Sequence, residues 1–85
     1  MSYFIIETRA GILPELTVRE GKRMIGFVQY LPDKNVIRGW GSRQVYDFPL
    51  LKTTDEVIIE EMRDIAQFFI DEDRTREEIR QRMKA

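Results

Sequence analysis

The chain has 85 residues, a net charge of −1 and neither cysteine nor histidine, so it has no disulfide, no thiolate zinc site and no histidine chemistry. Its 42% hydrophobic and 34% charged residues are typical of one small globular domain and unlike a disordered chain. No apolar run approaches the ~20 residues of a membrane span, and residues 1–9 lack signal-peptide features, so we expect a cytoplasmic protein with no membrane partner.

The first half of the chain predicts β-strands. Residues 3–8 are β-branched and aromatic, and Gly11 and Pro14 follow as strand-ending residues. Next come residues 16–20, which alternate apolar and polar, and residues 23–31. The two segments flank Gly21-Lys22, a two-residue turn with glycine first, and this pattern predicts a β-hairpin.

That hairpin turn also predicts which side chains lie opposite each other. It pairs Glu20 with Arg23, and it places Val18 beside Ile25 and Leu16 beside Phe27. Four apolar residues then share one face, as a half-buried sheet requires. Two further strands, residues 36–40 and 43–48, follow the turn at Pro32–Asn35 and flank Gly41-Ser42.

The turn at Pro32–Asn35 decides which face of the later strands is buried. If it closes with four residues and no bulge, Arg38 and Arg43 lie under the helix, where unpaired charge costs several kcal/mol. A bulge or a longer loop exchanges the buried and exposed faces of the strands that follow, because side chains alternate with a period of two. We therefore expect a bulge or a loop one residue longer there, and the core face then contains Leu16, Val18, Ile25, Phe27, Leu31, Ile37, Tyr46 and Phe48.

The second half predicts helices. Thr53 and Glu56 form a capping box, and apolar residues then recur at helical spacing, at Ile58, Met62, Ile65, Ala66 and Phe69. The acidic residues 71–73 are expected to end this helix. Thr75 with Glu78 is then a second capping box, which opens a short helix carrying Ile79 and Met83.

Strands followed by helices indicate the α+β class. We expect an antiparallel β-meander of four to five strands, followed by a packed C-terminal helix and a short second helix. The chain is expected to form a single domain, with a sheet in residues 1–49 and a helical half in residues 53–84.

The sheet face opposite the helix is the candidate binding surface. In the chosen register it carries Arg19, Met24, Val28, Tyr30, Arg38, Trp40, Arg43 and Val45. Aromatic residues, Met and Arg are enriched at protein interfaces, and a face meant only for water would be more polar. Gly39 and Gly41 bracket Trp40, and glycines within strands often mark close approach by another backbone or a ligand. The alternative is that Trp40 is a core aromatic covered by arginine side chains.

Signals for catalysis or metal binding are weak. Glu60, Glu61 and Asp64 are expected on a solvated helix face, and residues 71–73 lack the spaced oxygen ligands of a calcium loop. The glycines around Trp40 do not form a phosphate loop, because no helix follows them. We expect no catalytic activity, no metal and no cofactor.

The sequence therefore favours a small non-enzymatic binding protein, such as an adaptor, regulator or inhibitor. Its expected contact residues are Trp40, Arg38, Arg43, Tyr30, Met24 and Arg19. The partner is expected to be another protein or a second copy of the chain in a homodimer. The alternative is single-stranded nucleic acid stacked on the same arginine and aromatic face, although the near-neutral charge is unfavourable for it.

Overall fold

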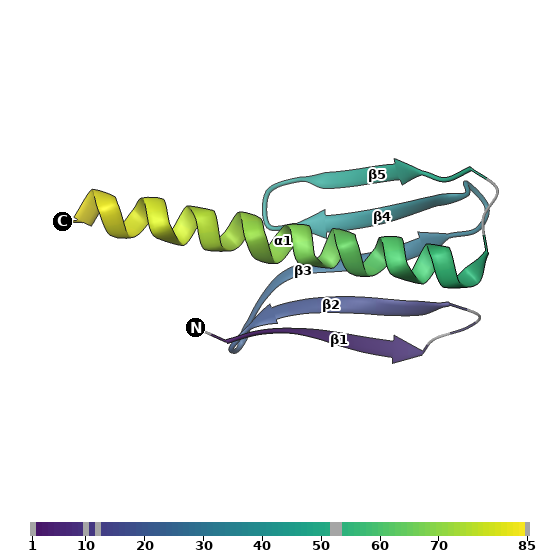
Figure 1. Ribbon diagram of the computed structural model, residues 1–85, viewed down its shortest axis with the longest axis horizontal. Helices are drawn as coiled ribbons and strands as arrows, with labels where there is room; N and C mark the ends of the chain where they lie inside the picture. Colours follow the sequence, from purple (N-terminus) through teal and green to yellow (C-terminus); the bar gives the residue numbers. More distant parts are fainter. Residues whose placement is uncertain (1, 10, 12, 52–53, 85) are drawn as a thin grey trace.

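A computed structural model of the chain describes residues 2–9, 11, 13–51 and 54–84. It has five strands and one helix (Figure 1), namely β1 (Tyr3–Arg9), β2 (Pro14–Glu20), β3 (Arg23–Leu31), β4 (Val36–Gly41), β5 (Val45–Pro49) and α1 (Asp55–Lys84). The strands form one antiparallel sheet in the order β1-β2-β3-β4-β5. The predicted α+β class with an antiparallel meander is confirmed.

Helix α1 crosses one face of the sheet and packs on β2, β3 and β4 (Figure 1). The core lies between these two layers. It is lined by Leu16, Val18, Ile25, Val28 and Ile37 from the sheet and by Ile58, Met62, Ile65, Ala66, Phe69 and Ile70 from the helix. We call the opposite side of the sheet the outer face, because α1, the only helix among the described residues, lies on the other side (Figure 1).

The predicted second helix is not present, because α1 continues without a break to Lys84. The hydroxyl of Thr75 donates to the Asp71 carbonyl, 2.9 Å away and four residues earlier, so it bonds within the helix and does not cap a new one. Thr53 lies outside the described residues. The cap observed is Thr54, whose Oγ1 accepts from the Val57 N–H at 3.4 Å.

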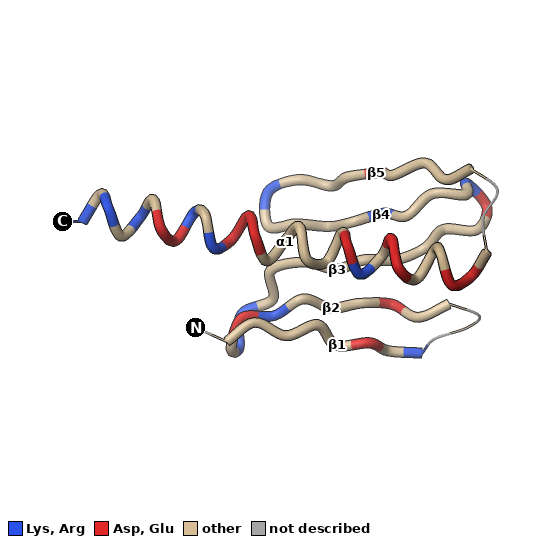
Figure 2. Tube along the Cα trace, viewed as in Figure 1, with Lys and Arg blue, Asp and Glu red and all other residues tan. Residues whose placement is uncertain are grey.

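Charge is distributed unevenly along α1. Acidic side chains dominate up to Asp73 and basic ones beyond it (Figure 2), which complements the helix dipole. The basic end projects past the sheet (Figure 1). Among the described residues, no helix combines the length and the apolar character that crossing a membrane requires.

The β2–β3 hairpin contains an irregularity that the sequence did not reveal. The Gly21-Lys22 turn pairs Glu20 with Arg23 as predicted, and Gly21 has a φ of 59°. The register then shifts, because Arg19 pairs with Met24 but Val18 pairs with Gly26. Ile25 is therefore an extra residue on β3, a β-bulge that reverses the alternation beyond it.

The bulge in this hairpin replaces the one predicted near Pro32. Leu31 pairs directly with Val36 across a four-residue loop, so the later turn has no bulge. As a result, Phe27 and Leu31 lie on the outer face and not in the predicted core, whereas Val28 and Tyr30 face the helix. The reason for expecting a bulge still holds, since Arg38 faces away from the helix.

Three glycines bring the helix unusually close to the sheet. A Cβ added to Gly26 would lie 2.7 Å from Phe69 Cδ2, one on Gly39 would lie 2.9 Å from its Cζ, and one on Gly41 would lie 3.0 Å from its Cε1. The Phe69 ring thus rests on bare backbone of β3 and β4. The close approach expected at Gly39 and Gly41 is made by this helix side chain.

Candidate interaction surface

An apolar row crosses the outer face from one edge of the sheet to the other. Cross-strand pairing places its five residues side by side, and we call them the central row: Ile6, Thr17, Phe27, Trp40 and Val45. Only one of them, Thr17, has a polar side chain. The sheet face that contacts water normally carries polar residues, so this apolar row is unusual for a solvent-exposed face.

Trp40 lies in the central row and outside the core. Its ring centroid is 5.4 Å from that of Phe27, at an interplanar angle of 43°. Both rings are half-buried, while Val45 beside them is 52% exposed. The Arg38 guanidinium lies 6.0 Å from the centroid of the Trp40 ring, so a cation borders the aromatic pair.

A polar row runs beside the central row, and it carries charges of both signs. Arg38 donates to Asp47 through two nitrogens, with Nε 2.7 Å from Oδ1 and NH2 3.0 Å from Oδ2. On the other side of Arg38, the Gln29 amide donates to Glu15 at 2.5 Å. The hydrogen bonds from Arg38 hold the pKa of Asp47 below its ordinary value. Arg38 is therefore oriented, and its charge is matched within the sheet.

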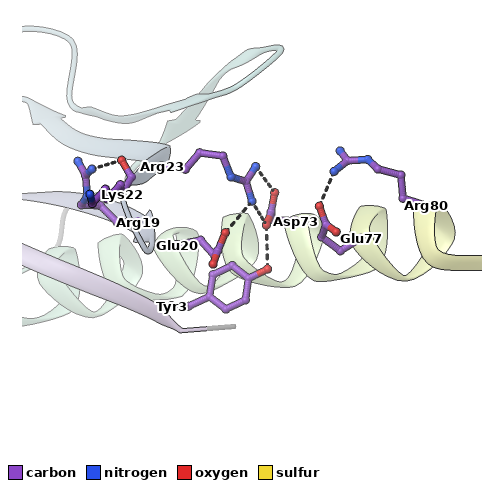
Figure 3. Close-up of polar contacts among 8 residues, drawn as sticks. All are labelled: Tyr3, Arg19, Glu20, Lys22, Arg23, Asp73, Glu77 and Arg80. Carbon is purple, nitrogen blue, oxygen red and sulfur yellow. Dashed lines mark hydrogen bonds and ion pairs between the residues drawn. The ribbon is translucent and has the colours of Figure 1, made fainter.

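The other predicted contact residues are dispersed around Trp40 and Arg38. Arg19 and Met24 pair across β2 and β3 near the Gly21 turn, where Arg19 donates to the Lys22 carbonyl (Figure 3). Arg43 is exposed in the β4–β5 connection. Tyr30 was expected on this surface, but it faces the helix side and its hydroxyl donates to Asn35 Oδ1 at 3.0 Å. The bulge at Ile25 moves Tyr30 to that side.

Four apolar residues of the outer face were not predicted there from the sequence: Phe4, Ile6, Phe27 and Leu31. Phe27 was assigned to the core because the bulge was placed in the wrong turn. Phe4 pairs with Arg19, and Ile6 pairs with Thr17, and these two side chains are 44% and 45% exposed. The run Tyr3-Phe4-Ile5-Ile6 was the available signal, because four successive apolar residues supply both faces of a strand.

A polar cluster around Asp73 is the other prominent feature (Figure 3). Asp73 is only 6% exposed, and its oxygens accept from Arg23 at 3.1 and 2.8 Å and from the Tyr3 hydroxyl at 2.8 Å. Burial raises the pKa of Asp73, but the hydrogen bonds from Arg23 and Tyr3 outweigh it and hold the pKa below its ordinary value. Burial and the same carboxylate raise the pKa of Tyr3 to about 12.

This cluster connects α1 to β1 and β3 and has its polar atoms satisfied. No buried side-chain nitrogen or oxygen among the described residues lacks a hydrogen-bond partner. Nor does that part of the chain contain three acidic, Cys or His side chains grouped to hold a metal ion. The Asp73 cluster therefore has a clear structural role, which leaves the outer face as the candidate site.

No protein-family model, curated protein or solved structure matches this chain. The function of the outer face is therefore inferred from the residue types, exposures and pairings given above. The face is crossed by apolar side chains and carries the oriented ion pair of Arg38 with Asp47.

Proposed function

We propose that this protein is a small non-enzymatic binding protein, an adaptor, regulator or inhibitor, that contacts another protein with its outer sheet face. The observation that carries the proposal is the central row, in which Phe27 and Trp40 form an aromatic pair on an uncovered sheet face. Contiguous exposed apolar patches with polar borders mark interaction sites. Aromatic residues at the centre of such patches supply much of the binding energy.

The electrostatics of the outer face support a protein partner over nucleic acid. Binding to phosphates requires cations whose charge is available, because it depends on the release of counterions. Arg38, the cation nearest Trp40, is paired with Asp47, and Glu15 lies in the same row. A mixed set of charges around an apolar centre suits a protein interface.

The test replaces Trp40 with alanine. We expect Trp40→Ala to keep the circular dichroism spectrum of the wild type but to bind a partner captured on wild-type protein at least about 30-fold more weakly, as for the loss of a central aromatic anchor. Phe68→Ala is the matched control, because Phe68 is an exposed aromatic residue of α1 on the opposite side of the sheet. Its affinity for the partner should stay close to the wild-type value.

Two results would contradict the proposal. Unfolding of Trp40→Ala would make Trp40 a structural residue, and unchanged partner affinity would place the binding site elsewhere. Titration with a mixed single-stranded oligonucleotide tests the alternative, since affinity that falls steeply with salt would indicate contacts to phosphates.

A further inference from the structure

The two edges of the sheet differ in how they are protected from other strands. β5 is short, carries Asp47 and ends at Pro49, and charges and proline are devices that block pairing at an edge. β1 is longer, contains no proline and pairs with β2 without a bulge, and its two charged residues, Glu7 and Arg9, follow a first half of four apolar residues. Its side chains are exposed on both faces, with Ile5 37% exposed towards the helix side. β1 is therefore the open edge of this sheet.

One hydrogen bond shows which backbone N–H and C=O groups of β1 point towards β2 and which point away from the sheet. The Gly21 N–H donates to the Ser2 carbonyl at 3.1 Å, so the backbone polar groups of Ser2 face β2. In antiparallel pairs this direction alternates along the strand. The groups of Phe4 and Ile6 therefore also face β2, and those of Ile5 and Glu7 point away from the sheet, where another strand can bind.

We propose that β1 binds the β1 strand of a second copy of this chain, in antiparallel pairing centred on Ile5. The two five-stranded sheets then form one continuous sheet. The two-fold axis is perpendicular to that sheet, so both helices lie on one side of it. Because the inference concerns the edge of β1 and shares only Ile6 with the central row, it does not rest on the proposed function.

The side chains favour the register centred on Ile5. In this register Ile5 lies opposite its own copy, and Phe4 lies opposite Ile6 of the second copy. All three apolar residues are then paired, and such cross-strand apolar pairs stabilise a sheet. Centring the pairing on Glu7 would instead place two like charges opposite each other, and centring it on Thr8 would leave Phe4 and Ile5 unpaired.

Charge complementarity identifies a second copy as the occupant. In this register Glu7 lies opposite Tyr3 of the second copy, and both side chains are on the helix side, where Glu7 meets Arg63 and Tyr3 meets Asp73. The Arg74 guanidinium lies 4.9 Å from the centroid of the Tyr3 ring. Asp73 and Glu20 beside Tyr3 are both paired with Arg23, so Arg74 is the cation that the Glu7 carboxylate of the other copy would approach. The two-fold symmetry of the dimer forms this opposite-charge contact twice. A peptide of unrelated sequence would not supply it.

Disulfide trapping tests both the edge and the register, because the chain contains no cysteine. Residues in a hydrogen-bonded antiparallel pair have Cα atoms about 5.5 Å apart, within disulfide range. We expect Ile5→Cys to form a disulfide-linked dimer under mild oxidation. Thr8→Cys is the control on the same strand. In the register centred on Ile5, the two copies of residue 8 are six residues apart along the strands, which separates their thiols by roughly 20 Å. It should remain reduced, as should Val45→Cys near the opposite edge.

Sedimentation of the wild type and of Ile5→Lys gives the second readout. We expect the wild type to dimerise with rising concentration. Ile5→Lys should stay monomeric with an unchanged circular dichroism spectrum, because two ammonium groups would meet at the axis. Trp40→Ala should dimerise like the wild type, so a failure of the proposed function leaves this result unaffected.

Three outcomes would overturn the inference. One is a wild type that stays monomeric at all concentrations, and another is Thr8→Cys cross-linking as readily as Ile5→Cys. The third is loss of the dimer in Trp40→Ala but not in Ile5→Lys, which would move the dimer interface to the outer face. If Ile5→Lys fails to fold, the comparison of cysteine variants decides the question.

Discussion

Asp73 illustrates, at the scale of single residues, how one buried carboxylate joins the two layers of this small protein. It lies within a run of three acidic residues that was expected to end the helix, yet the helix continues through it. Its side chain points to the sheet, where it accepts from Arg23 and Tyr3 (Figure 3). A buried charge is tolerated when it is paired and hydrogen-bonded in this way.

Asp73→Asn tests the contribution of the Asp73 carboxylate with little change in side-chain volume. The amide cannot form the ion pair with Arg23, and we expect the free energy of unfolding to fall by about 1–2 kcal/mol, a modest value because the Arg23 side chain is 47% exposed. Urea unfolding followed by circular dichroism measures the change. Asp64→Asn, on the exposed side of the same helix, should stay within about 0.5 kcal/mol of the wild type.

The same variant should change how stability depends on pH. The pKa of Asp73 is lower in the folded state, so its stabilisation is present above the ordinary value near 4 and is lost as the pH falls through the folded pKa. Tyr3 has the opposite sign, since its contribution is complete below pH 10 and is lost as the pH rises towards its folded pKa of about 12. The stability gap between wild type and Asp73→Asn should therefore narrow in acid, and a constant gap would contradict the role of the carboxylate.

At the scale of elements, glycines shape the contact of α1 with β3 and β4 alongside the buried side chains of Val28 and Ile37. Phe69 lies against Gly26, Gly39 and Gly41, each of which would bring a Cβ within about 3 Å of its ring. These glycines lie on the helix side of the sheet, and Trp40 between two of them points to the outer face. The helix can therefore approach closely without displacing the aromatic pair on the other side.

Gly26→Ala should be destabilising because its Cβ would approach Phe69 Cδ2 and Cγ, atoms near the base of the side chain that move least. Overpacking of this kind typically costs about 1–3 kcal/mol. In a Phe69→Leu background, where the ring is absent, the same substitution should cost clearly less. Thermal or urea unfolding of the four proteins gives the coupling energy, and an equal cost in both backgrounds would contradict the clash.

At the scale of the whole molecule, the sheet has three distinct surfaces. One face packs on the helix, the outer face carries the central row, and the β1 edge is open to another strand. Trp40 is the only tryptophan of the chain and lies on β4, three strands away from the β1 edge. Its emission therefore reports on the outer face separately from the edge.

We expect dilution of the dimer to leave Trp40 emission unchanged, because β1 and β4 are roughly 14 Å apart across the sheet. Binding of a protein partner to the outer face should shift the emission to shorter wavelengths and reduce quenching by acrylamide. Fluorescence during dilution and during titration with the captured partner measures both effects. A shift on dilution alone would indicate that the copies associate through the outer face.

Local patterns in the sequence determined the α+β class, the Gly21 turn and most of the helix. Alternation in strands, turn residues and helical spacing are short-range signals. They can therefore be read without knowing which strand or helix each segment packs against. The same alternation placed Arg38 and Trp40 on the outer face, because a charge beneath the helix would be too costly. It did not reveal that the helix passes through Asp73, since the cation that pairs with this residue lies 50 positions earlier.

Only the tertiary structure decided where the sheet bulges, and with it which residues share a face with Trp40. The bulge at Ile25 brings Gly26 under Phe69, and it moves Phe27 to the outer face and Tyr30 to the helix side. Gly26 beside the bulge was a weak local signal, since glycine within a strand often marks one. Strand alternation did not reveal the bulge, because it accommodates Phe69, more than 40 residues later in the chain. Since side chains alternate with a period of two, one inserted residue reverses the face of those that follow it.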